Sequence, residues 1–307
     1  MDTEKMKRFI AVAGPTASGK SALALQLCRQ LDGEFISCDS MQIYRGMDIG
    51  TAKPTPAEMA EIPHHLIDIL DPDQSFSAAD YQPLAENAVE NILSRGKMPI
   101  FCGGTGLYLD VVITGNAFSA GDTDTALRQQ LTDMDPALLY RRLQEIDPQA
   151  AAAIHPNNHK RVVRAVEIYE TTGMTKTEWD ARSRTTPSEF RGKVLVLDHT
   201  DRDELYRRIN DRVDQMMAAG LADEVRALHL PPDSTAAQAI GYKELIACFQ
   251  GKMTLDEAVE KIKTATRNYA KRQLTWFRRK PYSIMLPVEK GQSFKDIVNN
   301  ALKVLTD

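Results

Sequence analysis

Short apolar runs alternate along this chain with longer stretches in which apolar residues recur every three or four positions. The short runs are rich in Val, Ile, Leu or Phe, which is typical of strands buried on both faces of a parallel sheet. Helical patterns, such as those at 79–95 and 203–219, lie between the runs. This alternation predicts a doubly wound α/β fold. The expected strands are 8–13, 34–38, 99–103, 193–198 and 283–286.

The stretch from 115 to 192 breaks the alternation, because it contains helical patterns and no convincing strand. Asp135-Pro136 and Asp147-Pro148 are typical helix starts, with proline at the first helical position. A further helix is expected over 158–171, ending near Gly173. We therefore expect an α/β core formed by residues 1–114 and 193–307, interrupted by a helical insertion domain at 115–192.

The composition of the 307 residues is that of an ordinary globular protein, with 43% hydrophobic and 26% charged residues. No apolar run is long enough to cross a bilayer, so no membrane partner is expected. The four cysteines are scattered, without the paired spacing of a zinc module, and indicate reduced thiols in a cytoplasmic protein. The net charge of −4 means that any nucleic-acid binding must come from a local patch.

A phosphate-loop motif follows the first expected strand. Residues 14–21 fit the pattern G-x-x-x-x-G-K-[ST], and the strand before them and the helix after them are the context that supports it. Backbone N–H groups of such a loop wrap an anion, and the helix N-terminus adds positive potential. Lys20 would contact phosphate oxygens, and Ser21 would be a Mg²⁺ ligand. The core is therefore expected to resemble a P-loop NTPase, although the motif does not say which polyphosphate it holds. The expected anion-binding residues are Gly14, Pro15, Thr16, Ala17, Ser18, Gly19, Lys20 and Ser21.

The ends of the next strands supply further candidates, because strand ends on the carboxyl side of an open α/β sheet form the ligand crevice. Asp39 follows the second strand and could be a Mg²⁺ ligand, a general base or a helix cap. The third strand runs into Gly103-Gly104-Thr105-Gly106, whose glycines permit close backbone approach and positive φ. Thr105 could present its hydroxyl to the same crevice. Asp198 ends the fourth strand, where a structural or capping carboxylate is favoured over a metal-binding one.

Two further polar segments leave alternatives open. The Gly-Thr-Ala-Lys-Pro segment at 50–54 reads as a solvated loop. Arg208 and Arg212 share one helix face and could clamp a diphosphate. From spacing alone, surface pairing with Asp211 and Asp214 is favoured.

Residues 267–280 form a basic and aromatic segment. They include six basic residues and no acid, with Tyr269, Trp276 and Phe277 interleaved. This mixture suits a nucleic-acid backbone and base stacking. The alternative is an amphipathic helix whose aromatic side chains pack into the core while its basic side chains are solvated. The pattern does not separate these interpretations, and both can hold at once.

Taken in order, these motifs resemble those of bacterial tRNA dimethylallyltransferases (tRNA isopentenyltransferases). The resemblance covers about residues 8 to 285, with Ser21 at a position that is often Thr. It rests on 14–21, Asp39-Ser40-Met41-Gln42, 50–54, 103–108, Gly241-Tyr242-Lys243-Glu244, 267–278, and His155-Pro156-Asn157-Asn158 followed by Arg161 and Arg164.

The resemblance implies an activity. Such an enzyme moves a dimethylallyl group from dimethylallyl diphosphate to N6 of the adenosine just 3′ of the anticodon, in tRNAs that read codons beginning with U. Diphosphate is released, and Mg²⁺ is required with Ser21 as a ligand. On this reading Asp39 is the general base and Thr105 orients it. Lys20 and Arg212, with Arg208, stabilise the leaving diphosphate.

The resemblance also implies that the insertion and the basic segment grip the anticodon stem-loop of tRNA. We expect the protein to be a monomer. The expected tRNA contacts are Ser40, Met41, Gln42, Lys160, Arg161, Val162, Val163, Arg164, Gln238, Gly241, Lys243, Arg267, Lys271, Arg272 and Arg278.

Three competing functions share parts of this pattern. A P-loop small-molecule kinase explains the phosphate loop but not the insertion or the basic segment. An isopentenyltransferase acting on free adenine nucleotides shares the core but needs neither of those parts. An RNA-binding regulator without activity would not need Lys20, Ser21 and Asp39 together.

Overall fold

The computed structural model describes residues 6–115, 125–183 and 188–306. It divides into two compact units. The sheet unit comprises Met1–Ile113 and Glu189–Asp307, and the helical unit is Thr114–Ser188. Within the expected insertion, 116–124 and 184–187 lie outside the described residues.

The sheet unit is built on six parallel strands in the order β3-β2-β4-β1-β5-β6, which confirms the expected α/β fold. β5 begins at Phe190 rather than at 193, because Phe190 already pairs with Lys7 at the start of β1. The sequence pattern missed β3, since its two histidines carry no apolar run. The strands are β1 (Lys7–Ala13), β2 (Gly33–Ser37), β3 (His64–His65), β4 (Met98–Gly103), β5 (Phe190–His199) and β6 (Ser283–Val288).

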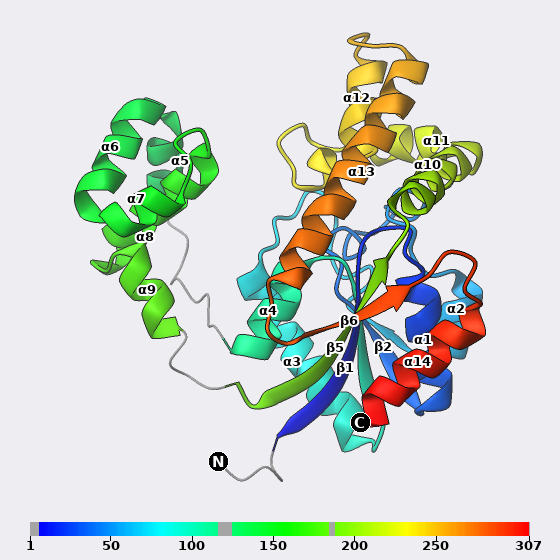
Figure 1. Ribbon diagram of the computed structural model, residues 1–307. Coiled ribbons are helices and arrows are strands. Elements are labelled where there is room, and N and C mark those ends of the chain that lie inside the picture. Colours follow the sequence, from blue (N-terminus) through cyan, green and yellow to red (C-terminus); the bar gives the residue numbers. More distant parts are fainter. Residues whose placement is uncertain (1–5, 116–124, 184–187, 307) are drawn as a thin grey trace. The chain divides into compact units, whose positions relative to one another are not determined.

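Helices cover both faces of this sheet (Figure 1). α1 and α14 pack on one face, where Val12, Leu27 and Val298 belong to one buried cluster. α3 packs against β1, β2 and β4 from the other face, and its first turn is capped by Ser77. The helices around the sheet are α1 (Lys20–Gln30), α2 (Pro56–Glu61), α3 (Ala78–Ser94), α4 (Gly106–Thr114) and α14 (Phe294–Thr306).

A second layer of helices lies beyond the carboxyl ends of the strands (Figure 1). Its own core includes the buried side chains of Tyr44, Val213 and Tyr242. Ala17 of the phosphate loop is buried in a cluster with Ile209 and Ala270, so two helices of this layer pack directly on the loop. The elements are α10 (Arg202–Ala218), α11 (Leu221–Leu228), a 3₁₀ turn (Ala236–Gln238), α12 (Tyr242–Phe249) and α13 (Leu255–Arg278).

The helical unit confirms the predicted helix starts. The carboxylates of Asp135 and Asp147 accept hydrogen bonds from the first turns of α6 and α7. Gly173 ends α8 with a φ of 69°, a conformation that favours glycine. The helices are α5 (Thr125–Asp133), α6 (Pro136–Ile146), α7 (Pro148–Ala153), α8 (His159–Thr172) and α9 (Lys176–Ser183).

The core of the helical unit corrects two expected tRNA contacts. The side chains of Val162 and Val163 are 1% and 5% exposed and pack with Leu139 and Leu143. Because they are buried, they stabilise the unit and have no side-chain surface for RNA.

None of the helices in the described part of the chain is long and apolar enough to span a bilayer.

Candidate active site

The phosphate loop joins β1 to α1 through a backbone that needs glycine. Gly14 has a φ of 141° and Gly19 a φ of 93°, conformations that side chains rarely adopt. An added Cβ at Gly14 would also lie 3.0 Å from the carbonyl oxygen of Leu197. Because α1 begins at Lys20, the loop brings the positive end of the helix and its free N–H groups to one place.

Lys20 and Arg212 give this place a positive charge that is partly buried. Burial lowers the pKa of Lys20, and the nearby charge of Arg212 lowers it further. Burial also lowers the pKa of Arg212, while the charge of Asp39 opposes that shift. Two desolvated cations side by side favour an anionic ligand, since it restores the solvation that burial removes.

Arg208 and Arg212 of α10 lie at the phosphate loop, so the surface pairing favoured from spacing is wrong. The Arg208 Nε donates to the Ala17 carbonyl oxygen at 3.0 Å. Asp214, the expected partner on α10, instead pairs with Lys263 at 2.8 Å. Arg212 lines two cavities beside the loop.

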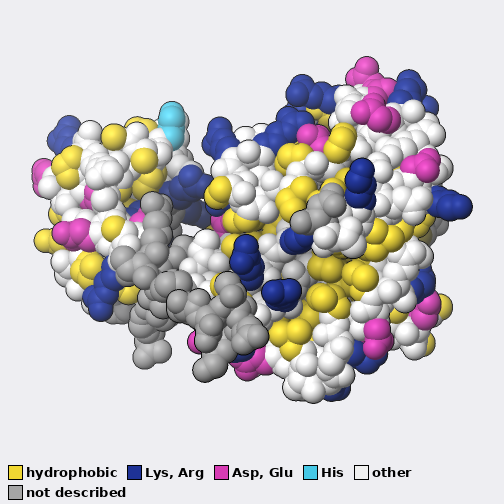
Figure 2. Space-filling model, turned by 60° about the horizontal axis from the view of Figure 1, so that its bottom comes forward, with side chains coloured by type: hydrophobic (Ala, Val, Ile, Leu, Met, Phe, Trp, Pro, Cys, Tyr) yellow, Lys and Arg dark blue, Asp and Glu magenta, His cyan; other side chains and the backbone are white. Residues whose placement is uncertain are grey.

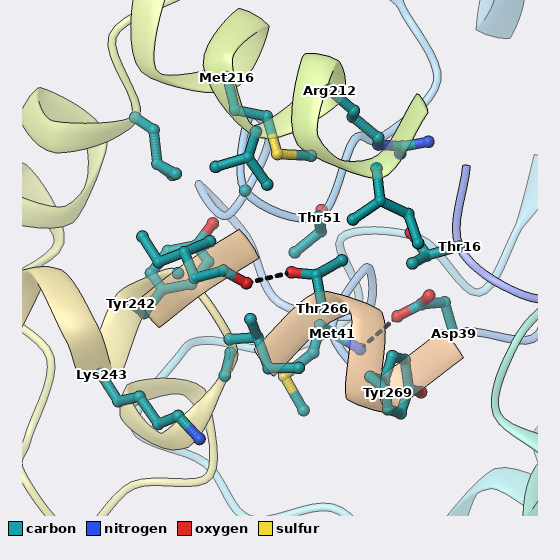
Figure 3. A pocket seen from close by; sticks show the side chains of 18 of the residues that line it. Thr16, Asp39, Met41, Thr51, Arg212, Met216, Tyr242, Lys243, Thr266 and Tyr269 are labelled. Atoms are coloured by element: carbon teal, nitrogen blue, oxygen red, sulfur yellow. Dashed lines mark hydrogen bonds between the residues drawn. The ribbon is translucent and has the colours of Figure 1, made fainter. Parts of the chain in front are cut away.

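These two cavities share a wall formed by Arg212 and Met216. The first has a volume of about 330 Å³ and is lined by Thr16, Asp39 and a band of apolar side chains (Figure 3). The second has a volume of about 640 Å³ and is lined by Gly19, Ser21 and other residues around the start of α1. An anion site at the phosphate loop thus adjoins an apolar chamber that contains a carboxylate.

Asp39 lies in a turn after β2, and its Oδ1 accepts a hydrogen bond from the Met41 N–H at 2.9 Å (Figure 3). No helix begins there, so the helix-cap alternative is wrong. Tyr269 lies beside Asp39 in the same cavity (Figure 3). Burial, with the charge of Asp39 adding to it, raises the pKa of Tyr269 to about 12, which keeps that hydroxyl protonated at neutral pH.

The glycine-rich turn after β4 is explained by close packing alone. An added Cβ would lie 2.0 Å from the Cys38 carbonyl oxygen at Gly103 and 1.9 Å from the Gln273 Nε2 at Gly104. The expectation of positive φ is wrong, because none of the three glycines of this turn has it. The Thr105 Oγ1 accepts from the Ser40 N–H at 3.1 Å, so it fixes the residue next to Asp39.

Gln273 is a site residue that the sequence pattern did not single out. Its Oε1 accepts from the Thr16 N–H at 2.9 Å, and its Nε2 donates to the Gly104 carbonyl oxygen at 3.1 Å. The side chain is 4% exposed. This one amide therefore ties α13 to the phosphate loop and to the turn after β4. A glutamine within a basic helix gave no local signal of that role.

The 50–54 segment is not a solvated loop. The Lys53 side chain is 3% exposed, and its Nζ donates to the Tyr44 carbonyl oxygen at 2.7 Å and to Asp48 at 2.6 Å. Gly50 and Thr51 line the first cavity. The segment is part of the wall of the site.

Asp198 has the structural role that was favoured for it. Its carboxylate pairs with Arg278 at the end of α13, at 2.7 Å.

The basic segment at 267–280 packs as the amphipathic alternative predicts. Phe277 is fully buried, while Lys271 and Arg272 are exposed. Across the face seen in Figure 2, Lys and Arg side chains are interspersed with hydrophobic ones.

The other predicted tRNA contacts fall in different places. Gln42 is 9% exposed and lines the second cavity, and its amide is bonded to Ser37 and to the Thr51 carbonyl oxygen, so it supports the wall of the site. Arg161 and Arg164 line a groove of about 570 Å³ on the helical unit. The predicted contacts that line the first cavity are Ser40, Met41, Gln238, Gly241, Lys243 and Arg272.

Fold and site together define a P-loop α/β protein whose phosphate loop lies beside an apolar chamber with a carboxylate. Comparison with known proteins agrees with the resemblance carried by the motifs. The family model described as IPP transferase matches residues 42–280. The chain belongs to this IPP transferase family.

Relatives and solved structures match over most of the chain. A tRNA dimethylallyltransferase of Anoxybacillus flavithermus is 48% identical over 89% of this chain and 88% of its own. A tRNA dimethylallyltransferase 1 of Pelobacter propionicus is 44% identical over 97% of both. A crystal structure of the Bacillus halodurans tRNA isopentenylpyrophosphate transferase superposes with a TM-score of 0.72 at 43% identity, covering 98% of this chain and 96% of that one. A eukaryotic dimethylallyltransferase crystallised acting on tRNA gives a TM-score of 0.82 at 31% identity, covering 97% of this chain and 77% of that one.

Proposed function

We propose that this protein transfers a dimethylallyl group from dimethylallyl diphosphate to N6 of the adenosine 3′ of the anticodon, in tRNAs that read codons beginning with U. The observation that carries the proposal is the shared wall. Arg212 lines the second cavity with Ser21 and the first cavity with Asp39, and its charge acts on Lys20. A diphosphate donor held at the loop can thus present its carbon chain to an acceptor beside Asp39.

One bond forms and one breaks at the transferred carbon, and one proton moves from N6 to Asp39. The lone pair of N6 attacks the allylic carbon, and the bond from that carbon to the diphosphate oxygen breaks. The adenine amine is a weak nucleophile, because its lone pair is delocalised into the ring. Asp39 accepts the proton that N6 loses, which is the work of a general base. Diphosphate leaves with the bonding electrons, and Lys20 and Arg212 stabilise its charge.

The apolar band of the first cavity has a part in this chemistry. Ile209, Val213 and Met216 line the chamber next to Asp39. Apolar walls exclude water, which would otherwise attack an allylic carbon that carries partial positive charge. They also strengthen the charge interactions of the buried cations.

We propose Mg²⁺ as the cofactor. In the described residues, no group of three His, Cys, Asp or Glu side chains could hold a metal ion. Ser21 lines the second cavity at the start of α1, and a single hydroxyl fits a Mg²⁺ that takes most of its ligands from phosphate oxygens and water. When bound, Mg²⁺ neutralises charge on the diphosphate.

The helical unit and the basic segment are proposed to hold the anticodon stem-loop. Exposed Lys160 and Arg161 of α8, and exposed Lys271 and Arg272 of α13, supply cations for RNA phosphates. We further propose that the protein works as a monomer in the cytoplasm. The four free cysteines agree with a reducing compartment.

An acceptor comparison tests the function against its alternatives. The protein is incubated with Mg²⁺ and dimethylallyl diphosphate, and prenyl transfer is measured to AMP and to an anticodon stem-loop RNA. We expect transfer to the RNA. Transfer to AMP alone would support the enzyme of free nucleotides, and ATP turnover without RNA would support a kinase.

The role of Asp39 has its own test. Asp39→Ala should lose most of the turnover while the affinity for RNA stays unchanged. Equal losses of RNA affinity and turnover would contradict a general base.

A further inference from the structure

One loop forms a wall of both cavities. Gly50 and Thr51 line the first cavity, and Ile49, Ala52 and Lys53 line the second. We call residues 48–54 the wall loop. Whatever fixes its position therefore sets the width of the path between the anion site and Asp39.

A carboxylate from another helix holds this loop by its backbone. The Glu224 Oε2, on α11, accepts hydrogen bonds from the Asp48 N–H at 2.9 Å and the Ile49 N–H at 2.6 Å. Its Oε1 accepts from the Gly50 N–H at 3.1 Å. Three successive N–H groups converging on one anion form a nest, and hydrogen bonds to an ionised acceptor are the strong ones.

Tyr242 contacts both the Glu224 carboxylate and the wall loop. Its hydroxyl donates to the Glu224 Oε1 at 2.6 Å. Burial and the charge of Glu224 raise the pKa of Tyr242, so the hydroxyl stays protonated and remains a donor. An added Cβ at Gly50 would lie 2.5 Å from the Tyr242 ring, so the loop backbone rests directly on that ring.

The far end of the loop has a second anchor. The buried Nζ of Lys53 donates to Asp48, at 2.6 Å, and to Asp68. The loop is thus held at both ends, and the Glu224 carboxylate is the part of this attachment that comes from α11, in the layer of helices that closes the site.

We propose that Glu224 is a positioning residue that fixes the wall loop and through it selects a five-carbon donor. The inference rests on the proposed function and adds to it a determinant of donor size. If the carboxylate releases the loop, both cavities widen on the same side. The donor is then held less tightly, and a longer prenyl chain is rejected less well. The chemistry at Asp39 is untouched, because Glu224 lines neither cavity.

The main experiment replaces Glu224→Gln and measures kcat and KM with dimethylallyl diphosphate and with geranyl diphosphate, using the anticodon stem-loop RNA as acceptor. Glutamine keeps the size of the side chain but loses the charge, and it turns an NH₂ group toward N–H donors. We expect KM for dimethylallyl diphosphate to rise about tenfold with kcat changed less than about threefold. The preference in kcat/KM for the five-carbon donor should fall about tenfold.

The matched control is Asp223→Asn. Asp223 is the neighbouring acid on the same helix, exposed and paired with Arg226 at 2.8 Å. This change removes the same charge without touching the wall loop, and both kinetic ratios should stay within about twofold of wild type. Glu224→Asp keeps the charge and should restore part of the lost preference.

Two further measurements keep the inference open to refutation. If Glu224→Gln does not fold, Tyr242→Phe removes a single hydrogen bond and should shift the donor preference in the same direction by a smaller factor. Hydrogen exchange at the amides of Asp48, Ile49 and Gly50 tests the attachment without any activity, and it should quicken in the Glu224→Gln variant.

The outcomes separate this inference from the proposed function. Absence of prenyl transfer by the wild type would refute the function, whereas faster amide exchange would still support the hold of Glu224 on the loop. A folded Glu224→Gln variant with unchanged KM and unchanged donor preference would overturn the inference. A lower melting temperature alone would show that the carboxylate only stabilises the fold.

Discussion

The Gln273 amide links α13 to the phosphate loop and to the turn after β4, so its removal should destabilise the fold. Gln273→Leu puts an apolar side chain of similar size at a buried position of α13 and removes both hydrogen bonds of the amide. The Thr16 N–H and the Gly104 carbonyl oxygen each lose a partner that now lies at 2.9 and 3.1 Å. The amide packs tightly against the Gly104 backbone, where an added Cβ would lie 1.9 Å from the Gln273 Nε2.

The expected cost follows from those two groups. A buried backbone group left without a partner costs about 1–3 kcal/mol, so the loss of both should lower the free energy of unfolding by about 2–4 kcal/mol, given that Thr16 is only partly buried. Because the phosphate loop loses its support as well, KM for dimethylallyl diphosphate should rise in the same variant.

Urea unfolding followed by circular dichroism measures the free energy, and Gln250→Leu, at an exposed glutamine, is the matched control. A loss below about 1 kcal/mol in Gln273→Leu would contradict this role of the amide, because a loss that small is typical of a surface substitution. Equal losses in the two variants would also refute it.

Other predictions concern charge and exposure. Lys20→Met should weaken binding of inorganic diphosphate at least tenfold, roughly the worth of a charge-assisted contact, and calorimetry that shows equal affinities would contradict this. Burial lowers the pKa of Lys20, and only the protonated lysine attracts the anion. The affinity advantage of wild type over Lys20→Met should therefore fade as pH rises, at a pH below the usual lysine pKa. An advantage that stays constant up to about pH 10.4 would contradict this. Burial raises the pKa of Cys28 and of Cys102 to about 12, so at pH 8 iodoacetamide should label Cys248 well before either, as peptide mass mapping would show. RNA affinity should fall steeply with salt, and Lys271→Ala should reduce the slope of log K against log salt by about one; an unchanged slope would remove Lys271 from the interface.

Local patterns predicted the parts of the fold that depend on local physics. Continuous apolar runs predict buried strands, and all five expected strands are present. An Asp cap followed by proline predicts a helix start, and both predicted starts, those of α6 and α7, are present. β3 was missed because it pairs through its backbone and carries two histidines. Its existence depends on β2 lying beside it, which is not a local property.

The parts of the site that sequence could not supply depend on tertiary contacts. The charged pattern of Arg208 and Arg212 is the same for a surface helix and for one packed on a phosphate loop. Only the buried contact of Ala17 with α10 decides between them. Lys53 looked solvated because a lone lysine in a polar segment gives no hint of the three oxygen atoms that surround it. The same reason hid Gln273, whose partners lie more than a hundred residues away.

The proposed activity is prenyl transfer from the phosphate-loop site to a tRNA adenosine. Its most direct test is mass analysis of an anticodon stem-loop RNA after incubation with the protein, dimethylallyl diphosphate and Mg²⁺, followed by digestion to nucleosides. We expect one dimethylallyl group on N6 of the adenosine 3′ of the anticodon, and much less of it when Asp39→Ala replaces the wild type. Unmodified RNA in the presence of folded wild-type protein, or a prenyl group on any other position, would contradict it.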